Sequence, residues 1–329
     1  MSKPKLLSTR PLFDSVRHLL NEHFDVDYWT DSERIPRAEL LRRVADKVGL
    51  ICLLTETVDE ELLAAAPRLR LAATVSVGYD NIDLAACTRH HVVATNTPGV
   101  LDETTADFAW VLLFAVARRL TEAVDLMQSG MWRGWDLDQL CGADVWGKTL
   151  GLIGFGRIGR AVARRAAGFR MRVLYADVAR ASTKIEKELS AEYVDLDRLL
   201  AESDFVTVHT PLLPETRHLV STPQLARMKP SAFLINTSRG PVVDEAALVQ
   251  ALEARQLAGA ALDVYENEPK PHPGLLARKN VVLTPHIASA SVETRTRMAM
   301  IAAENAIDLF AGRRPANALN PEALERAAR

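Results

Sequence analysis

Short apolar runs alternate with amphipathic stretches along the first hundred residues of this 329-residue chain. The runs have the length and the aliphatic content of strands, and the stretches between them have the 3.6-residue period of helices. Such an alternation predicts a mostly parallel sheet with helices on its faces. The predicted strands are residues 6–8, 24–29, 48–54, 71–75 and 92–95, and the predicted helices are residues 12–23, 37–46, 59–66 and 84–90.

The alternation stops at the Asn-Thr-Pro-Gly segment 96–99 and starts again at residue 149. A helix predicted over residues 107–119 is apolar on nearly all sides, so we expect it to be buried between domains or between subunits. Six later strands with crossover helices between them match the count of a doubly wound sheet. A last helix over residues 291–310 could return to the first domain. The six strands are predicted at residues 150–153, 172–176, 205–209, 232–236, 259–262 and 281–284.

Composition and charge narrow the class of protein. Apolar residues make up 48% and charged residues 25%, as in ordinary globular proteins, and the length favours two domains. The net charge of −2 comes without a basic block, so neither nucleic acid nor a membrane surface is expected as a partner. The longest apolar stretch is too short to span a bilayer, and no signal-peptide region is apparent. The three cysteines have no metal-binding spacing. We expect a cytoplasmic protein without a metal site.

A glycine-rich segment carries the first chemical signal. The strand predicted at residues 150–153 is followed at once by Gly154-Phe155-Gly156-Arg157-Ile158-Gly159 and then by a helix over residues 160–168. This is the context that the dinucleotide fingerprint requires. The first glycine permits the tight turn, the second lets the backbone approach the pyrophosphate, and the third lets the helix pack on the strand. The helix N-terminus offers N–H groups to the anion.

Asp177 indicates which dinucleotide binds. It ends a predicted strand eighteen residues after Gly159, and a carboxylate there accepts hydrogen bonds from the ribose hydroxyls of NAD and repels the 2′-phosphate of NADP. Arg180 nearby could soften this discrimination. The alternative is a surface aspartate in a turn. NAD is therefore the predicted cofactor, with NADP less favoured.

Three side chains at predicted strand ends suit acid–base chemistry on a carboxylate. Arg239 follows one strand, Glu268 follows the next, and His286 follows the last. The carboxyl ends of parallel strands share one edge of a sheet, where ligands bind in open α/β folds. An arginine fork binds a planar carboxylate, and a carboxylate orients a histidine for proton transfer. On spacing alone, a surface ion pair for Arg239 and a structural role for His286 stay open.

Four motifs together resemble those of the D-isomer-specific 2-hydroxyacid dehydrogenases. They are residues 154–159, Asn-Thr-Ser-Arg-Gly at 236–240, Asp-Val-Tyr-Glu-Asn-Glu-Pro at 263–269 and Thr-Pro-His-Ile at 284–287. The resemblance implies that Arg239 binds the substrate carboxylate, that His286 is the acid and base, and that Glu268 is its partner. It implies that Glu266 is not catalytic. It also implies a Rossmann NAD-binding domain, residues 101–289, inserted into a flavodoxin-like substrate domain, residues 1–100 plus 290–329.

The resemblance extends to further binding residues. The backbone around Val77 and Gly78 is similar to the loop that receives the substrate carboxylate. Segments 96–101, 117–120 and 130–135 resemble the glyoxylate and hydroxypyruvate reductase branch, which implies a homodimer paired through the apolar helix and a Trp135 that reaches the partner's substrate pocket. The implied cofactor contacts, besides the glycine segment and Asp177, are His209, Thr210, Thr216, Thr237, Ser238, Arg239, Asp263, His286 and Ala288.

These observations predict a reductase that uses NADH on glyoxylate or hydroxypyruvate. Other 2-oxoacids, such as 2-ketogluconate or pyruvate, are alternatives on the same machinery. Phosphite is disfavoured, because phosphite-oxidising relatives carry a lysine where this chain has Val77. A NAD-sensing scaffold similar to the C-terminal-binding-protein corepressors is an alternative of another class. The lack of long disordered or charged extensions favours the enzyme.

Overall fold

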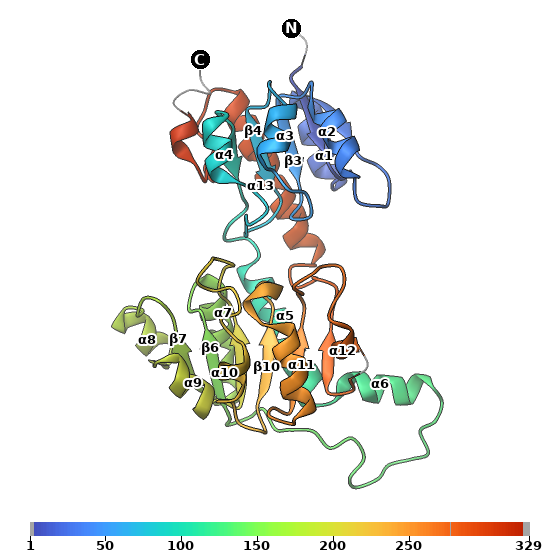
Figure 1. The fold of residues 1–329 in the computed structure, drawn as a ribbon, viewed down its shortest axis with the longest axis vertical. Helices are drawn as coiled ribbons and strands as arrows, with labels where there is room; N and C mark the ends of the chain where they lie inside the picture. Colours follow the sequence, from blue (N-terminus) through green and yellow to red (C-terminus); the bar gives the residue numbers. More distant parts are fainter. Residues whose placement is uncertain (1–2, 277, 325–329) are drawn as a thin grey trace. The chain divides into compact units, whose positions relative to one another are not determined.

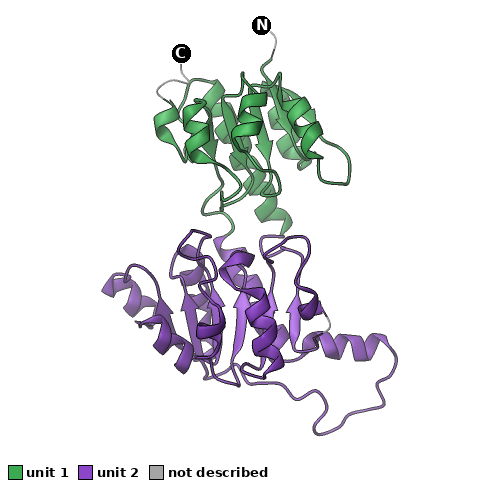
Figure 2. Ribbon diagram, in the orientation of Figure 1, with its two compact units in different colours: residues 1–101, 291–329 green, residues 102–290 purple. Residues whose placement is uncertain are grey.

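The computed structural model describes residues 3–276 and 278–324, and the chain divides into two compact units (Figure 2). Unit 1 comprises residues 1–101 and 291–329, and unit 2 comprises residues 102–290. The second unit is therefore inserted in sequence between the two pieces of the first. Both units are α/β folds built on parallel sheets, which confirms the predicted fold class.

Unit 1 contains a parallel sheet with the strand order β2-β1-β3-β4-β5 (Figure 1). Strands β3, β4 and β5 are buried along their whole length, as expected for strands covered on both faces. The elements are β1 (Lys5–Ser8), α1 (Asp14–His23), β2 (Asp25–Tyr28), α2 (Arg37–Val44), β3 (Gly49–Cys52), α3 (Glu60–Ala65), β4 (Leu71–Thr74), α4 (Leu84–Arg89), β5 (Val93–Thr95), α13 (Val292–Phe310) and η3 (Pro321–Ala323).

Two cores, one on each face of this sheet, hold unit 1 together. Leu6 and Ile51 face α1 and α13, whereas Leu7 and Leu50 face α2, α3 and α4. Adjacent strand residues thus point to opposite faces, as the pleat requires. The last segment is tied to β5 through Asn320, whose side chain accepts from the Ala94 N–H (2.8 Å) and donates to the Val92 carbonyl (2.9 Å). Helix α13, which packs on α1 and β4, and the segment that follows it thus belong to the same unit as the first hundred residues.

Unit 2 contains a longer parallel sheet with the order β12-β11-β10-β9-β6-β7-β8. Helices α5 and α7 pack on one face, and α9, α10 and α11 pack on the other. The elements are α5 (Asp102–Ala117), α6 (Leu120–Gln128), β6 (Thr149–Ile153), α7 (Arg157–Ala166), η1 (Ala167–Phe169), β7 (Arg172–Ala176), α8 (Thr183–Leu189), β8 (Ala191–Tyr193), α9 (Leu196–Glu202), β9 (Phe205–Val208), α10 (Thr222–Leu225), β10 (Phe233–Asn236), η2 (Gly240–Val242), α11 (Glu245–Glu253), β11 (Gly259–Leu262), α12 (Pro273–Leu276) and β12 (Val281–Leu283).

The prediction of six strands for this sheet was one strand short. Strand β8 pairs with β7 at the edge of the sheet, through contacts such as Val173 with Ala191. It is three residues long, and two of its three side chains are exposed. An edge strand covered on one side carries no continuous apolar run, so the pattern did not mark it.

The prediction that the apolar helix is buried between domains is wrong, whereas its predicted place in a subunit interface stays a prediction. Helix α5 packs on α7 and on strands β10 and β11 of its own unit. Trp110 is 5% exposed and donates its indole N–H to the Val162 carbonyl (3.2 Å), whereas Val111 is 52% exposed. The apolar surface of α5 is therefore mostly used inside unit 2.

After α5, several large apolar side chains are exposed on the next helix and on the segment that follows it. Arg119, at φ +52°, separates α5 from α6, a helix without a buried residue that the sequence did not predict. We call residues 129–146 the arm, which leaves α6, runs away from the sheet of unit 2 and returns to it at Val145, a residue of the unit 2 core (Figure 1). The large apolar side chains exposed on it are Met131, Trp132, Trp135, Leu137 and Trp146.

Candidate active site

The glycine segment forms the turn between β6 and α7. Gly154 has φ +93°, and a Cβ there would lie 2.8 Å from the carbonyl carbon of His209. A Cβ on Gly159 would lie 2.3 Å from the Gly154 carbonyl oxygen. Both positions therefore require glycine, because the backbone of neighbouring segments occupies the space of a side chain.

The N-terminus of α7 fits the pyrophosphate of a dinucleotide. Gly156 is the N-cap and makes no side-chain cap, so the first N–H groups of α7, at Arg157 and Ile158, need a partner from outside the helix. Nothing lies within 4 Å of a Cβ built on Gly156, so the backbone is open to an approaching ligand there. The turn is thus closed where the protein packs and open where an anion would bind.

Asp177 lies beside this turn, directly after β7. One carboxylate oxygen accepts the Phe155 N–H (2.6 Å) and the other accepts the Ala179 N–H (3.3 Å). These bonds hold the carboxylate at the second strand of the fingerprint, where an acidic residue meets the adenosine ribose. Asp177 therefore lies where the adenosine ribose of a dinucleotide would bind.

Other predicted cofactor residues follow the next strands at the same carboxyl edge. The hydroxyl oxygens of Thr210 and Thr237 are buried and have no hydrogen-bond partner within residues 3–276 and 278–324, as expected of groups that await a ligand. Burial lowers the pKa of His209 to about 3, so its ring is neutral. Thr216 is different, because its hydroxyl donates to the Pro211 carbonyl (2.6 Å) and so holds its own loop.

The loop after β10 carries Arg239. Asn236 shapes this loop by accepting the Ser238 N–H (3.0 Å) and donating to the Arg239 carbonyl (3.0 Å). A Cβ on Gly240 would lie 1.8 Å from the carbonyl carbon of Tyr265, so the loop after β10 packs backbone to backbone on the loop after β11. Arg239 is thereby fixed next to the segment that carries Glu268, on which its positive charge acts.

His286 and Glu268 form a pair. The Nδ1 atom of His286 lies 3.1 Å and 3.0 Å from the two carboxylate oxygens of Glu268. His286 has φ +55°, a backbone conformation that costs energy for a residue with a side chain. The hydrogen bonds of Asp263 hold that turn, because its carboxylate accepts from the Ile287 N–H (2.9 Å) and the Ala288 N–H (2.7 Å).

The pKa values of Glu268 and Asp263 are shifted in opposite directions. Burial alone would raise the pKa of Glu268, but its hydrogen bond to His286, the histidine charge and the Tyr265 N–H outweigh burial and leave the pKa below its usual value. Burial raises the pKa of Asp263, against the lowering effect of its bonds to Thr284 and to the backbone. Glu268 is thus an anion ready to face an imidazolium, while Asp263 is fully buried beneath the turn.

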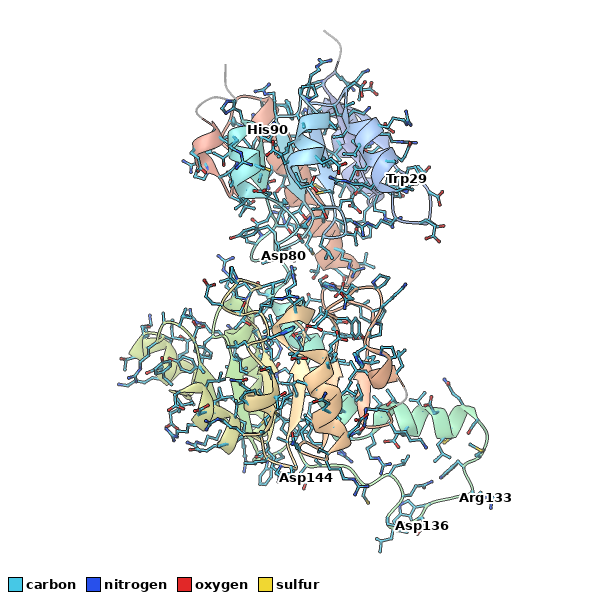
Figure 3. The ribbon with its side chains drawn as sticks, in the orientation of Figure 1. Trp29, Asp80, His90, Arg133, Asp136 and Asp144 are labelled. Carbon is cyan, nitrogen blue, oxygen red and sulfur yellow. The ribbon has the colours of Figure 1, made fainter. Side chains whose placement is uncertain are left out.

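The structure brings most of the sequence-predicted residues to one edge of the unit 2 sheet, but not all of them. Val77 and Gly78 lie in unit 1, where their carbonyls accept from the Asn96 side chain (2.8 Å) and the Ser76 hydroxyl (2.6 Å). Trp135 is 82% exposed on the arm, whose residues Arg133 and Asp136 lie away from the sheet of unit 2 (Figure 3). Its predicted role is to reach the pocket of a partner subunit, which stays a prediction.

Sequence reasoning missed the residues that support these loops. Glu245, 3% exposed at the start of α11, accepts the N–H groups of Glu266 (2.5 Å) and His272 (2.7 Å) and so clamps the loop that carries Glu268. His218 forms a hydrogen-bonded pair with Glu266. An acidic residue in the first turn of a helix is common, so the sequence pattern gave Glu245 no distinguishing signal.

Residues 3–276 and 278–324 contain neither a membrane-spanning helix nor a cluster of metal ligands. No helix in this part of the chain is long and apolar enough to cross a membrane. No group of three or more histidine, cysteine or acidic side chains in it could hold a metal ion.

The doubly wound sheet and its glycine turn define unit 2 as a dinucleotide-binding domain. Residues 110–288 match the family model of the NAD-binding domain of the D-isomer-specific 2-hydroxyacid dehydrogenases. The chain belongs to that family and is an oxidoreductase with a nicotinamide dinucleotide as cofactor.

Full-length relatives place the chain in the glyoxylate reductase branch. It is 50% identical to a glyoxylate reductase of Korarchaeum cryptofilum over 325 residues, which cover 98% of each chain. A crystal structure of a Thermus thermophilus protein has a TM-score of 0.90 at 42% identity and covers 96% of this chain and 99% of its own. An NADPH-dependent glyoxylate/hydroxypyruvate reductase of Sinorhizobium meliloti, in complex with NADP and malonate, has a TM-score of 0.86 at 33% identity and covers 97% of each chain.

Proposed function

We propose that this protein reduces glyoxylate or hydroxypyruvate to the 2-hydroxyacid, of D configuration where the product is chiral, with NADH as the reductant. The observation that carries the proposal is the His286–Glu268 pair, with nitrogen to oxygen distances of 3.0 and 3.1 Å, beside Arg239 on a dinucleotide-binding sheet. The names of the relatives support the substrate class. When bound, the nicotinamide supplies the hydride that adds to C2 of the 2-oxoacid.

We assign binding of the substrate carboxylate to Arg239. A guanidinium donates two parallel hydrogen bonds to a carboxylate, which fixes the orientation of the acid as well as its charge. The loop around Arg239 is held by Asn236 and by the close packing of Gly240, and the Nη1 atom of Arg239 donates to the Ser238 carbonyl (2.9 Å). The backbone N–H groups of Val77 and Gly78 remain predicted partners of the same carboxylate. Malonate in the Sinorhizobium meliloti enzyme is a carboxylate ligand in a relative of this fold.

His286 is assigned the proton transfer. Its Nδ1 faces Glu268, which makes Nε2 the nitrogen that gives a proton to the oxygen on C2 as negative charge develops there. Glu268 favours the imidazolium form and fixes the plane of the ring. A positioned histidine contributes roughly a hundred- to ten-thousandfold in rate.

Asp177 is assigned the preference for NADH over NADPH. Its carboxylate is held at the glycine turn by the Phe155 N–H (2.6 Å), where it would accept bonds from the ribose and repel a 2′-phosphate. The Sinorhizobium meliloti relative is NADPH-dependent, so the preference varies among proteins of this fold. Replacement of Asp177 by alanine should raise relative activity with NADPH by about ten- to 150-fold.

The experiment that tests this function is the loss of NADH absorbance with a panel of glyoxylate, hydroxypyruvate, pyruvate and 2-ketogluconate. We expect the highest kcat/KM with glyoxylate or hydroxypyruvate, and a lower value when NADPH replaces NADH. Glycolate has no stereocentre, so the D configuration is tested on the glycerate formed from hydroxypyruvate. L-glycerate, or a preference for pyruvate or 2-ketogluconate, would contradict the assignment. Nucleotide binding without turnover of any 2-oxoacid would favour a NAD-sensing role.

A further inference from the structure

The segment after Asp177 contains an arginine that is held in an ion pair. Arg180 lies three residues beyond Asp177. Its Nε and Nη2 atoms donate to the two carboxylate oxygens of Glu186, at 2.8 Å and 2.9 Å. Its guanidinium carbon also lies 5.8 Å from the centre of the Tyr193 ring. Glu186 therefore occupies the Nε–Nη2 edge of the Arg180 fork, one of the edges with which a guanidinium binds a phosphate or a carboxylate.

Glu186 is a rigid partner for that arginine. It lies on α8 and is 8% exposed, and its carboxylate also accepts the Tyr175 hydroxyl (2.7 Å). Tyr175 is fully buried, its ring stacks on Phe155 with centroids 3.9 Å apart, and its hydroxyl accepts the Ala181 N–H (2.9 Å). Hydrogen bonds from Arg180 and Tyr175 lower the pKa of Glu186 to about 2, so the carboxylate is ionised at neutral pH.

This arrangement bears on the choice between the two nicotinamide dinucleotides. In dinucleotide-binding folds, an acidic residue at the end of the second strand binds the ribose hydroxyls of NAD, and an arginine nearby accommodates the 2′-phosphate of NADP. This chain has both residue types within four positions. The side chain of Arg180 is 64% exposed, so solvent leaves it room to turn toward a phosphate once it is released.

We propose that Glu186 is a specificity-determining residue for the cofactor: it holds Arg180 and so withholds from a 2′-phosphate the one cation of this loop that could bind it. The inference rests on the proposed preference for NADH and adds a second contribution to it. Asp177 repels the phosphate directly, whereas Glu186 acts through Arg180. Removal of Asp177 alone would then leave the arginine engaged and recover only part of the affinity for phosphate.

Binding of nucleotide fragments tests this without turnover. The probes are 2′,5′-ADP, which carries the 2′-phosphate, and 5′-AMP, which lacks it, titrated by calorimetry into the intact chain. The variants are Asp177→Ser, Glu186→Gln, the double variant, and the double variant with Arg180→Gln added. Glutamine at 186 keeps an oxygen for the Tyr175 hydroxyl, so the packing of α8 is preserved. Glu188→Gln, at an exposed position of the same helix, makes the same change of charge.

We expect Glu186→Gln to tighten 2′,5′-ADP binding about tenfold in the Asp177→Ser background, or about 1.4 kcal/mol, with 5′-AMP affinity unchanged. The gain should vanish when Arg180→Gln is added, and Glu188→Gln should give none of it. An unchanged affinity for 2′,5′-ADP on Glu186→Gln would overturn the proposal, as would a gain that survives without Arg180. A wild-type protein that prefers NADPH would refute the proposed cofactor but leave this comparison measurable, so the two failures are distinguishable.

Discussion

Glu268→Gln is the substitution that tests the acid–base pair most directly. Glutamine keeps the size and one acceptor of the side chain but removes the negative charge that faces His286 across 3.0 Å. Reduction needs a proton on the imidazole, and without the carboxylate the imidazolium is less favoured. The rate of reduction should therefore begin to fall at a lower pH in the variant than in the wild type.

The geometry sets the size of the charge interaction that Glu268→Gln removes. Two unit charges 3.0 Å apart interact by about 1.4 kcal/mol at the dielectric constant of water and by about 5.5 kcal/mol at an effective value of about 20. The side chains of His286 and Glu268 are 25% and 32% exposed, so solvent screening favours the lower part of that range. The descending limb should therefore move to lower pH in the variant, by an amount that reflects the loss of this screened interaction.

The assay is the pH dependence of kcat/KM for glyoxylate, with NADH binding measured separately by fluorescence. Glu266→Gln is the matched control, because Glu266 lies two residues away on the same loop and pairs with His218 instead. That variant should keep the wild-type limb. If the descending limb of the Glu268→Gln profile coincides with that of the wild type, or if both variants shift the limb equally, then the negative charge of Glu268 does not stabilise the imidazolium of His286.

Four further predictions concern other parts of the molecule. Arg239→Lys should lower kcat/KM about ten- to 150-fold, because an ammonium loses one charge-assisted bond of the fork; a wild-type value would remove Arg239 from carboxylate binding. Glu245→Gln should lower kcat about tenfold or more and leave NADH affinity unchanged, because the new amide NH2 would face a backbone N–H that now donates to the carboxylate. Loss of NADH binding in this variant would instead indicate a general disturbance of the fold. Burial lowers the pKa of His209 from 6.5 to about 3, so the ring is neutral in the folded state and folding stability should fall by up to about 1.4 kcal/mol per pH unit as the pH drops below about 6.5. In denaturant titrations at several pH values, His209→Gln should show a shallower fall of stability with pH. Trp135→Ala should alter the ranking of 2-oxoacids and weaken a homodimer seen by sedimentation at micromolar concentration; a wild-type protein that is monomeric and active would contradict the dimer.

The sheets could be predicted from sequence because buried parallel strands read as continuous apolar runs. Strands β3, β9 and β10 are buried at every position, and each lies within a predicted strand. The same rule fails where burial is one-sided, which is why β8 was missed. The apolar pattern of α5 predicted burial but did not reveal which elements cover the helix. Helix α7 and strands β10 and β11 pack on it within unit 2, and its contact with a second subunit stays a prediction.

The site residues divide in a similar way. Gly154, Asp177 and His286 were found because each follows a strand in a motif whose spacing has a chemical meaning. Residues that support the site from outside these motifs have no such signature. Glu186 and Glu245 look like ordinary helix residues in the sequence, and only the fold reveals that one meets Arg180 and the other meets two N–H groups of a distant loop.

Those supporting residues explain how a conformation that costs energy can be kept ready for chemistry. His286 has a left-handed backbone, and such a residue persists only if its surroundings hold it there. The Asp263 carboxylate supplies that hold with bonds to the Thr284 hydroxyl (2.6 Å) and to the two N–H groups that follow His286. Glu245 does the same for the loop of Glu268. Because the loop of each member of the pair is held by its own buried carboxylate, the edge of the sheet sets the 3.0 Å distance between His286 and Glu268.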